Sequence, residues 1–174
     1  MSDVLEAVAS ARTAASADHG TSVEPTRMDL AKQAPDAYRH LVQLEGIVAQ
    51  HVERNLLHLV KLRGSQINGC AFCIAMHTEE ELRDGEATVR LTLLDAWREA
   101  TLYTPRERAA LNWVEEISLI ASRGASATSY ERIQAVFDQD EIAWLTLAGT
   151  LINAWNRIAI ASRAHYPAAS KRSG

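Results

Sequence analysis

The most informative stretch of the sequence spans residues 67–77 and reads INGCAFCIAMH. It contains the only two cysteines of the chain, Cys70 and Cys73, and places His77 four residues after the second. Each residue of an α-helix turns the chain by about 100°, so positions i, i+3 and i+7 fall on one stripe. The three side chains are therefore expected to project together from a helix. Two neighbouring thiols can form a disulfide, and an imidazole beside them can exchange the proton that this chemistry requires.

Two effects compete to activate these thiols. Asn68 and Gly69 break the preceding helix, and Asn68 is expected to cap the next one. Cys70 then lies in the opening turn, where the positive end of the helix dipole lowers the pKa of a thiol. Cys73 lies one turn later but is four residues from His77, a spacing at which helical side chains can touch. The sequence alone leaves open which cysteine is the thiolate.

Two other interpretations of the cysteine pair are weighed against the redox one. The cysteines can be small buried residues on an apolar helix face. Alternatively, Cys70, Cys73 and His77 can bind zinc, with His58 of the preceding helix as the fourth ligand. Zinc-binding Cys-x-x-Cys pairs usually lie in a turn that curls around the ion, whereas this pair lies in a predicted helix. The redox interpretation is therefore preferred, and neither a metal nor a cofactor is expected.

The composition predicts a soluble protein with one globular domain. The chain has 174 residues, of which 47% are apolar and 23% charged. A net charge of -4 argues against nucleic acid as a partner. Apolar runs such as residues 142–151 are shorter than the roughly 20 residues of a membrane span, so no membrane association is expected. No secretory signal is recognised at the N-terminus, and two cysteines are too few for a disulfide scaffold, so the expected location is the cytoplasm.

Helical spacing of apolar residues recurs along the chain, and no convincing strand is found. The predicted fold is an all-α bundle of about six to seven helices in one domain over residues 25–166. Residues 1–24 are expected to form an arm, and residues 167–174 a tail. The predicted helices span residues 35–50, 52–66, 70–83, 88–97, 105–122, 129–137 and 140–164.

One helix start carries a strong signal. Thr104 suits the N-cap, Pro105 the first helical position and Glu107 the third, which is the pattern of a capping box. In contrast, the acidic run of residues 79–81 is most simply interpreted as a solvated helix face.

The sequence resembles the alkylhydroperoxidase D and carboxymuconolactone decarboxylase-like superfamily over roughly residues 27–165. The resemblance rests on the segments LVKLRGSQINGCAFC (59–73), MHT (76–78), GE (85–86), LDAWRE (94–99) and TPRERAAL (104–111). It implies an all-helical fold that assembles into homo-oligomers, commonly trimers or hexamers. Because this chain has both cysteines, it resembles the peroxidase branch rather than the decarboxylases.

The resemblance also implies residue roles. Cys73 is the residue that attacks a hydroperoxide and becomes a sulfenic acid, and Cys70 resolves it to a disulfide. A protein or a small thiol then reduces the disulfide. His77 belongs to the proton relay that activates Cys73. The competing hypotheses are a dithiol–disulfide oxidoreductase without peroxide turnover and a non-enzymatic helical oligomer whose cysteines are structural or hold zinc.

The chain departs from the family pattern at two positions. The relay often includes a glutamate twelve residues before the first cysteine, where this chain has His58. A histidine that lies between the cysteines in the best-known peroxidase is replaced by Phe72. His58 can act as a base or orient a water, and it is retained as a candidate site residue. It cannot supply the fixed negative charge of a carboxylate.

Overall fold

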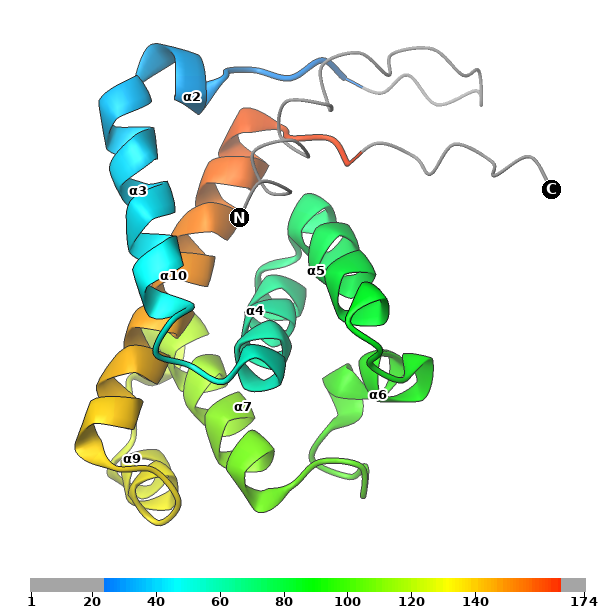
Figure 1. Cartoon of the computed structure of the whole chain (residues 1–174), viewed down its shortest axis with the longest axis vertical. Coiled ribbons are helices and arrows are strands. Elements are labelled where there is room, and N and C mark those ends of the chain that lie inside the picture. Colours follow the sequence, from blue (N-terminus) through cyan, green and yellow to red (C-terminus); the bar gives the residue numbers. More distant parts are fainter. Residues whose placement is uncertain (1–23, 167–174) are drawn as a thin grey trace, which may run out of the picture.

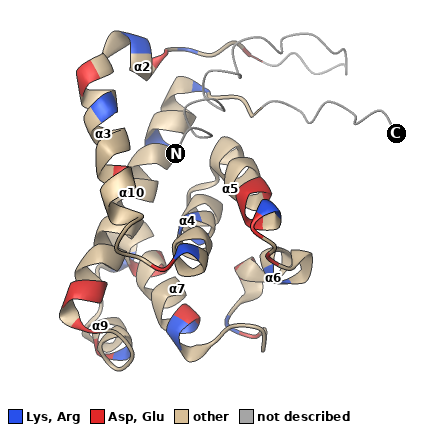
Figure 2. Ribbon diagram, in the orientation of Figure 1, with Lys and Arg blue, Asp and Glu red and all other residues tan. Residues whose placement is uncertain are grey.

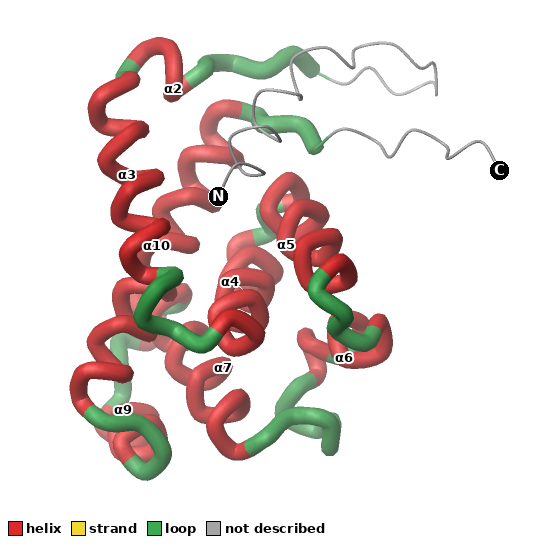
Figure 3. Tube along the Cα trace, in the orientation of Figure 1, coloured by secondary structure: helices red, strands yellow, loops and turns green. Residues whose placement is uncertain are grey.

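The computed structural model describes residues 24–166, and this part of the chain consists of helices and loops without a strand (Figures 1 and 3). The all-α prediction is therefore confirmed. The helices are α2 (Leu30–Gln33), α3 (Pro35–Val48), α4 (Arg54–Asn68), α5 (Ala71–Arg83), α6 (Thr88–Thr92), the 3₁₀-helix η1 (Leu94–Ala96), α7 (Pro105–Ser118), α8 (Ile120–Arg123), α9 (Ala127–Gln134) and α10 (Gln139–Ser162). The predicted arm and tail lie almost wholly outside the described residues. None of the described helices is long and apolar enough to cross a membrane.

Helix α4 is the centre of the bundle, because it packs against α5, α7 and α10 (Figure 1). One face of α4 contributes Val60 to a core that also includes Val48 of α3, Val114 of α7, Ile133 of α9 and Leu145 of α10. All five side chains are buried. This core holds the carboxyl end of α4 in place, and the cysteine motif follows it directly.

A second, smaller core covers another face of α4. Leu59 and Leu62 pack there with Leu94, Trp97 and Leu111. The segment that carries Leu94 and Trp97 was predicted as one helix over residues 88–97. It is instead divided into α6 and η1, because the chain turns to bring these two side chains onto α4.

A glycine allows α4 and α10 to approach closely. A Cβ atom added to Gly64 would lie 2.9 Å from Cγ2 of Ile152, a distance that real Cβ atoms essentially never show. Any larger residue at position 64 would push α10 away from α4. The close approach places buried side chains of α10 directly beside the carboxyl end of α4.

The predicted capping box is confirmed. The side chain of Thr104 accepts a hydrogen bond from the backbone N–H of Glu107, and the carboxylate of Glu107 accepts one from the N–H of Thr104 at 2.7 Å. The helix that starts there ends at Ser118 rather than near residue 122, and the short α8 follows it. The four-residue α2 was not predicted, because so short a segment has no detectable period, and α8 was predicted only as the end of the preceding helix.

Candidate active site

Cys70 begins the helix that carries the motif. Gly69 ends α4 in the left-handed conformation, with φ of 66°, and reverses the chain direction. Cys70 then occupies the N-cap of α5, and its Sγ accepts a hydrogen bond from the backbone N–H of Cys73 at 3.3 Å. The prediction that Asn68 caps this helix is wrong. Asn68 is the last residue of α4, and its amide points back to the carbonyl oxygen of Gly64.

A cluster of neutral amides lies beside the dithiol. The amide group of Asn68 donates to the side-chain oxygens of Asn153 and Asn156 on α10, each at 2.9 Å. Asn156 is completely buried and donates to Ser65 Oγ at 3.0 Å. Its amide also hydrogen-bonds the two thiols and lowers the pKa of each. The sequence motif gave no indication of Asn156, because this residue is more than eighty positions away in the chain.

The two thiols form one hydrogen-bonded pair in which Cys70 is the acidic member. Cys70 and Cys73 are both free thiols and are 1% and 3% exposed. The hydrogen bond from Cys73 lowers the pKa of Cys70 to about 7, although burial opposes this shift. The same hydrogen bond, together with burial, raises the pKa of Cys73 far above its usual range. When the reduced pair loses a proton, the negative charge therefore belongs to Cys70 and the remaining proton to Cys73.

His77 is buried one turn beyond Cys73 on α5, and its partner is a carboxylate that sequence reasoning missed. Nδ1 of His77 lies 2.9 Å from Oε2 of Glu80. Acidic residues gather along the second half of α5 (Figure 2), and the solvated face predicted for residues 79–81 is found only at Glu79, which is exposed. Glu81 is only 2% exposed, and Glu79 accepts a hydrogen bond from the hydroxyl of Tyr166 at 2.6 Å. The spacing of three residues between His77 and Glu80 was the available signal.

His58 of α4 lies near two of the carboxylates on this side of the molecule, those of Glu80 and Asp84. Its Nε2 lies 3.6 Å from Oδ2 of Asp84, and Nδ1 is buried without a hydrogen-bond partner. Burial lowers the pKa of His58, against the opposing effect of Glu80 and Asp84, so the ring is neutral at pH 7. The charges that act on it include those of Glu80 and His77, which places His58 in the same electrostatic neighbourhood.

The four predicted site residues do not form a metal site. Among residues 24–166, no group of three or more histidine, cysteine or acidic side chains is arranged to hold a metal ion. Cys70 and Cys73 hydrogen-bond each other, whereas His77 and His58 are directed to carboxylates of α5. The geometry therefore suits proton exchange rather than zinc coordination.

A cleft of about 230 Å³ reaches the dithiol at Cys70. Its walls come from the start of α5 and from the end of α10, and most of them are apolar. The lining residues are Gly69, Cys70, Ala71, Phe72, Ala159, Ile160, Arg163, Ala164 and His165. A small molecule in this cleft would contact Cys70 first.

Comparisons with known proteins agree with this fold. The model of the carboxymuconolactone decarboxylase family matches residues 35–116. The chain belongs to the alkylhydroperoxidase D and carboxymuconolactone decarboxylase-like superfamily, as its sequence motif predicted.

Three relatives define its place in this superfamily. The uncharacterized protein YdfG of Bacillus subtilis is 40% identical over 129 residues, which cover 74% of this chain and 88% of YdfG. The crystal structure of ATU0492 from Agrobacterium tumefaciens, a protein of unknown function suggested to be the antioxidant defence protein AhpD, is 41% identical. It superposes with a TM-score of 0.80 over 83% of this chain and 99% of its own. A peroxidase-related protein from Ralstonia eutropha JMP134 shares the fold at 16% identity, with a TM-score of 0.69 over 80% of this chain and 74% of its own.

Proposed function

We propose that this protein is a thiol-dependent peroxidase that reduces hydroperoxides through a cycle of the Cys70–Cys73 dithiol and disulfide. The observation that carries the proposal is the thiol pair itself, which is hydrogen-bonded at the start of α5 and has one member that ionises near pH 7. The apolar cleft beside Cys70 supports an organic hydroperoxide as the substrate. The family membership supports an antioxidant role.

The proposed reaction uses the two thiols, a hydroperoxide and a thiol reductant, and it needs no cofactor. A cysteine thiolate attacks the terminal oxygen of the hydroperoxide, the O–O bond breaks, and the alkoxide leaves as an alcohol after it takes a proton. The attacking sulfur becomes a sulfenic acid. The second thiol displaces water from it and closes the disulfide. Two thiols of a protein or small-molecule reductant then return the pair to the reduced state.

We assign the attack to Cys73 and the resolving role to Cys70, as the family resemblance implies. The proton of the reduced pair is held by Cys73, so this sulfur attacks only after a base has taken that proton. Cys70, which accepts the hydrogen bond, and His77, one helical turn away, are the two groups that can serve. His58 is proposed to act on the relay through the Glu80 and His77 pair.

Single cysteine variants test both the function and the roles. Cys73→Ser is expected to abolish peroxide consumption. Cys70→Ser is expected to allow one oxidation, which a sulfenic-acid probe such as dimedone labels at Cys73, but no turnover. If the probe labels Cys70 in the Cys73→Ser protein, and Cys73 in the Cys70→Ser protein stays unlabelled, the roles are reversed. A protein that forms the disulfide with an oxidised dithiol but consumes no peroxide is a dithiol–disulfide oxidoreductase instead.

We also propose that the protein acts in the cytoplasm as a homo-oligomer, a trimer or a hexamer. Several large apolar side chains are exposed on the single chain, and they support an assembly that covers them. The most exposed are Ile47, Val89, Ile120 and Ile160, at 45%, 53%, 57% and 47%. Sedimentation that finds only monomer at micromolar concentration would contradict the assembly.

A further inference from the structure

We propose that Glu80 is a positioning residue for His77, and that it supplies from α5 the carboxylate that the family commonly places on α4 at position 58. This inference rests on the proposed peroxidase function and adds Glu80 to the residues that take part in it. It is carried by the contact between Glu80 and His77 and by the replacement of the usual glutamate by His58.

The contact fixes which nitrogen of His77 is basic. Glu80 Oε2 lies 2.9 Å from His77 Nδ1, and the two side chains are 20% and 6% exposed. An ionised carboxylate can only accept a hydrogen bond, so Nδ1 must carry the hydrogen. In the neutral ring the lone pair then resides on Nε2. Glu80 thus selects one tautomer and stabilises the imidazolium that forms when Nε2 takes a proton.

The surroundings keep Glu80 ionised. Burial alone would raise the pKa of Glu80, but the hydrogen bond to His77 and the electrostatic effects of His77 and Lys61 hold this pKa below its ordinary value. Lys61 of α4 is itself ion-paired to Glu45 of α3. The titratable and charged groups around the pair are Glu45 from α3, Arg54, His58 and Lys61 from α4, Glu81 from α5, Asp84 at its end, and Tyr166.

The two neighbouring glutamates do not serve this purpose. Glu79 is exposed and accepts the hydrogen bond of the Tyr166 hydroxyl. Glu81 is buried, and burial, reinforced by Glu86, raises its pKa to about 8, so it is neutral at pH 7. Within the run, Glu80 alone combines a negative charge with a hydrogen bond to His77.

The substitution that removes the contact is Glu80→Ala, and Glu79→Ala is its matched control on the same helix. Nitrogen-15 NMR of the His77 ring measures the tautomer directly. In the wild type and in Glu79→Ala we expect Nδ1 to be protonated, and in Glu80→Ala we expect the Nε2–H form that free imidazole favours. We also expect Glu80→Ala to slow single-turnover oxidation of the dithiol by peroxide by about tenfold or more, while Glu79→Ala is unchanged.

A double substitution tests whether a carboxylate at position 58 of α4 can replace that of Glu80 on α5. His58→Glu is expected to restore the oxidation rate of Glu80→Ala, because it returns a carboxylate to the α4 position. In the wild-type background it is expected to bring no gain, because it adds a second negative charge near Glu80. If Glu80→Ala keeps the wild-type tautomer and rate, or if His58→Glu fails to rescue it, the inference is overturned. Absence of peroxide oxidation in the wild type would instead refute the peroxidase proposal and leave the tautomer result standing.

Discussion

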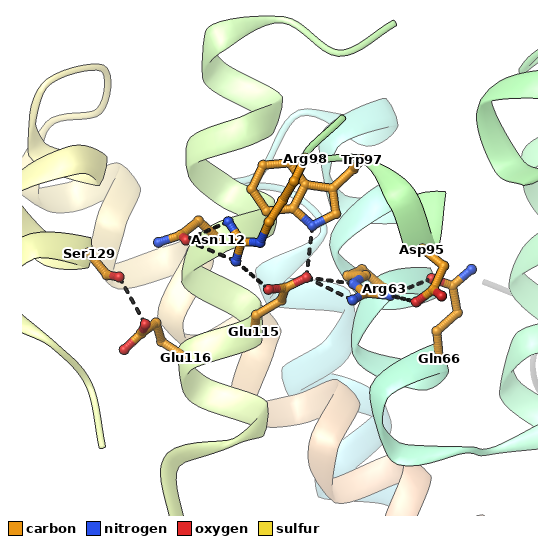
Figure 4. Close-up of polar contacts among 9 residues, drawn as sticks. All are labelled: Arg63, Gln66, Asp95, Trp97, Arg98, Asn112, Glu115, Glu116 and Ser129. Carbon is orange, nitrogen blue, oxygen red and sulfur yellow. Dashed lines mark hydrogen bonds and ion pairs between the residues drawn. The ribbon is translucent and has the colours of Figure 1, made fainter. Parts of the chain in front are cut away.

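Two clusters of buried charge flank α4, and they are built on different principles. In the first, Glu115 of α7 receives hydrogen bonds on both oxygens (Figure 4). Arg63 Nε and Trp97 Nε1 each lie 2.8 Å from Oε1, and Arg98 Nη2 lies 2.5 Å from Oε2. Arg63 also contacts Asp95. Guanidinium, indole and carboxylate groups are therefore hydrogen-bonded to one another throughout this cluster.

The second cluster contains His58, His77, Glu80 and Glu81, and it is incomplete. Two of its buried atoms, His58 Nδ1 and Glu81 Oε1, have no hydrogen-bond partner. Burial lowers the pKa of His58 and raises that of Glu81 to about 8, so both side chains are mainly uncharged at pH 7, which is unusual for a glutamate. The contrast teaches that arginine–carboxylate pairs hold α4 against α7, whereas groups with shifted pKa values lie between α4 and α5, the helix that carries the dithiol.

Glu115→Ala is expected to have the largest effect on stability. It leaves Arg63, whose side chain is 12% exposed, without its main partner. Loss of one member of a buried ion pair typically costs about 3–5 kcal/mol of unfolding free energy. Urea denaturation measures this loss, and Glu80→Ala serves as the comparison, with an expected loss of about 1 kcal/mol. Equal losses in the two variants would remove the distinction between the clusters.

The dithiol is expected to titrate as a pair with a single reactive member. Because the pKa of Cys70 is about 7 and that of Cys73 is raised far higher, alkylation by iodoacetamide should modify Cys70 first. The rate should rise about tenfold between pH 6 and pH 8, as the thiolate fraction does. Mass spectrometry of the reduced protein after brief alkylation identifies the site. Preferential modification of Cys73 would show that the proton is held by Cys70.

The buried carboxyl of Glu81 should make stability fall as the pH rises. Its pKa is about 8 in the folded protein, against an ordinary value of 4.5. The folded state therefore holds a proton that the unfolded state has lost between these two values, and this stability is lost as the pH rises toward 8. Glu81→Gln should flatten the profile and stabilise the protein at pH 8.5 by on the order of 1 kcal/mol. Parallel pH profiles of unfolding free energy for wild type and variant would contradict this prediction.

His58→Leu should have the smallest effect on stability. It removes a buried nitrogen that has no partner, and the leucine fills similar space, so we expect a change within about 1 kcal/mol of either sign. A loss as large as that of Glu115→Ala would show that His58 is a structural residue. Thermal unfolding of both variants in one buffer makes the comparison.

The part of the molecule that could be predicted from sequence is the part built from local patterns. The capping box from Thr104 to Glu107 and the dithiol from Cys70 to Cys73 each need only four consecutive residues. Helical periodicity was sufficient for α3, α4, α7 and α10, because each has a long apolar stripe. The break between α6 and η1 was missed, because it depends on where Trp97 packs in the folded chain.

The candidate site was only partly predictable for the same reason. Cys70, Cys73 and His77 share one motif, but Asn156 reaches the thiols from α10 and has no local signature. Glu80 is three residues after His77, a spacing at which helical side chains can touch. However, a run of three glutamates is usually a solvated helix face. Only the burial of α5 against α4 distinguishes the three.

Sγ of Cys70 caps the amino end of α5, and this cap links the oxidation state of the dithiol to a backbone hydrogen bond. In the reduced protein, the N–H of Cys73 donates to Sγ of Cys70, the more acidic of the two thiols. A disulfide sulfur is neutral and a weak acceptor, so this first-turn amide loses its partner when the bond to Cys73 closes. Hydrogen–deuterium exchange at the Cys73 amide should therefore accelerate on oxidation, and the fraying of one helix end would report the redox state of the protein.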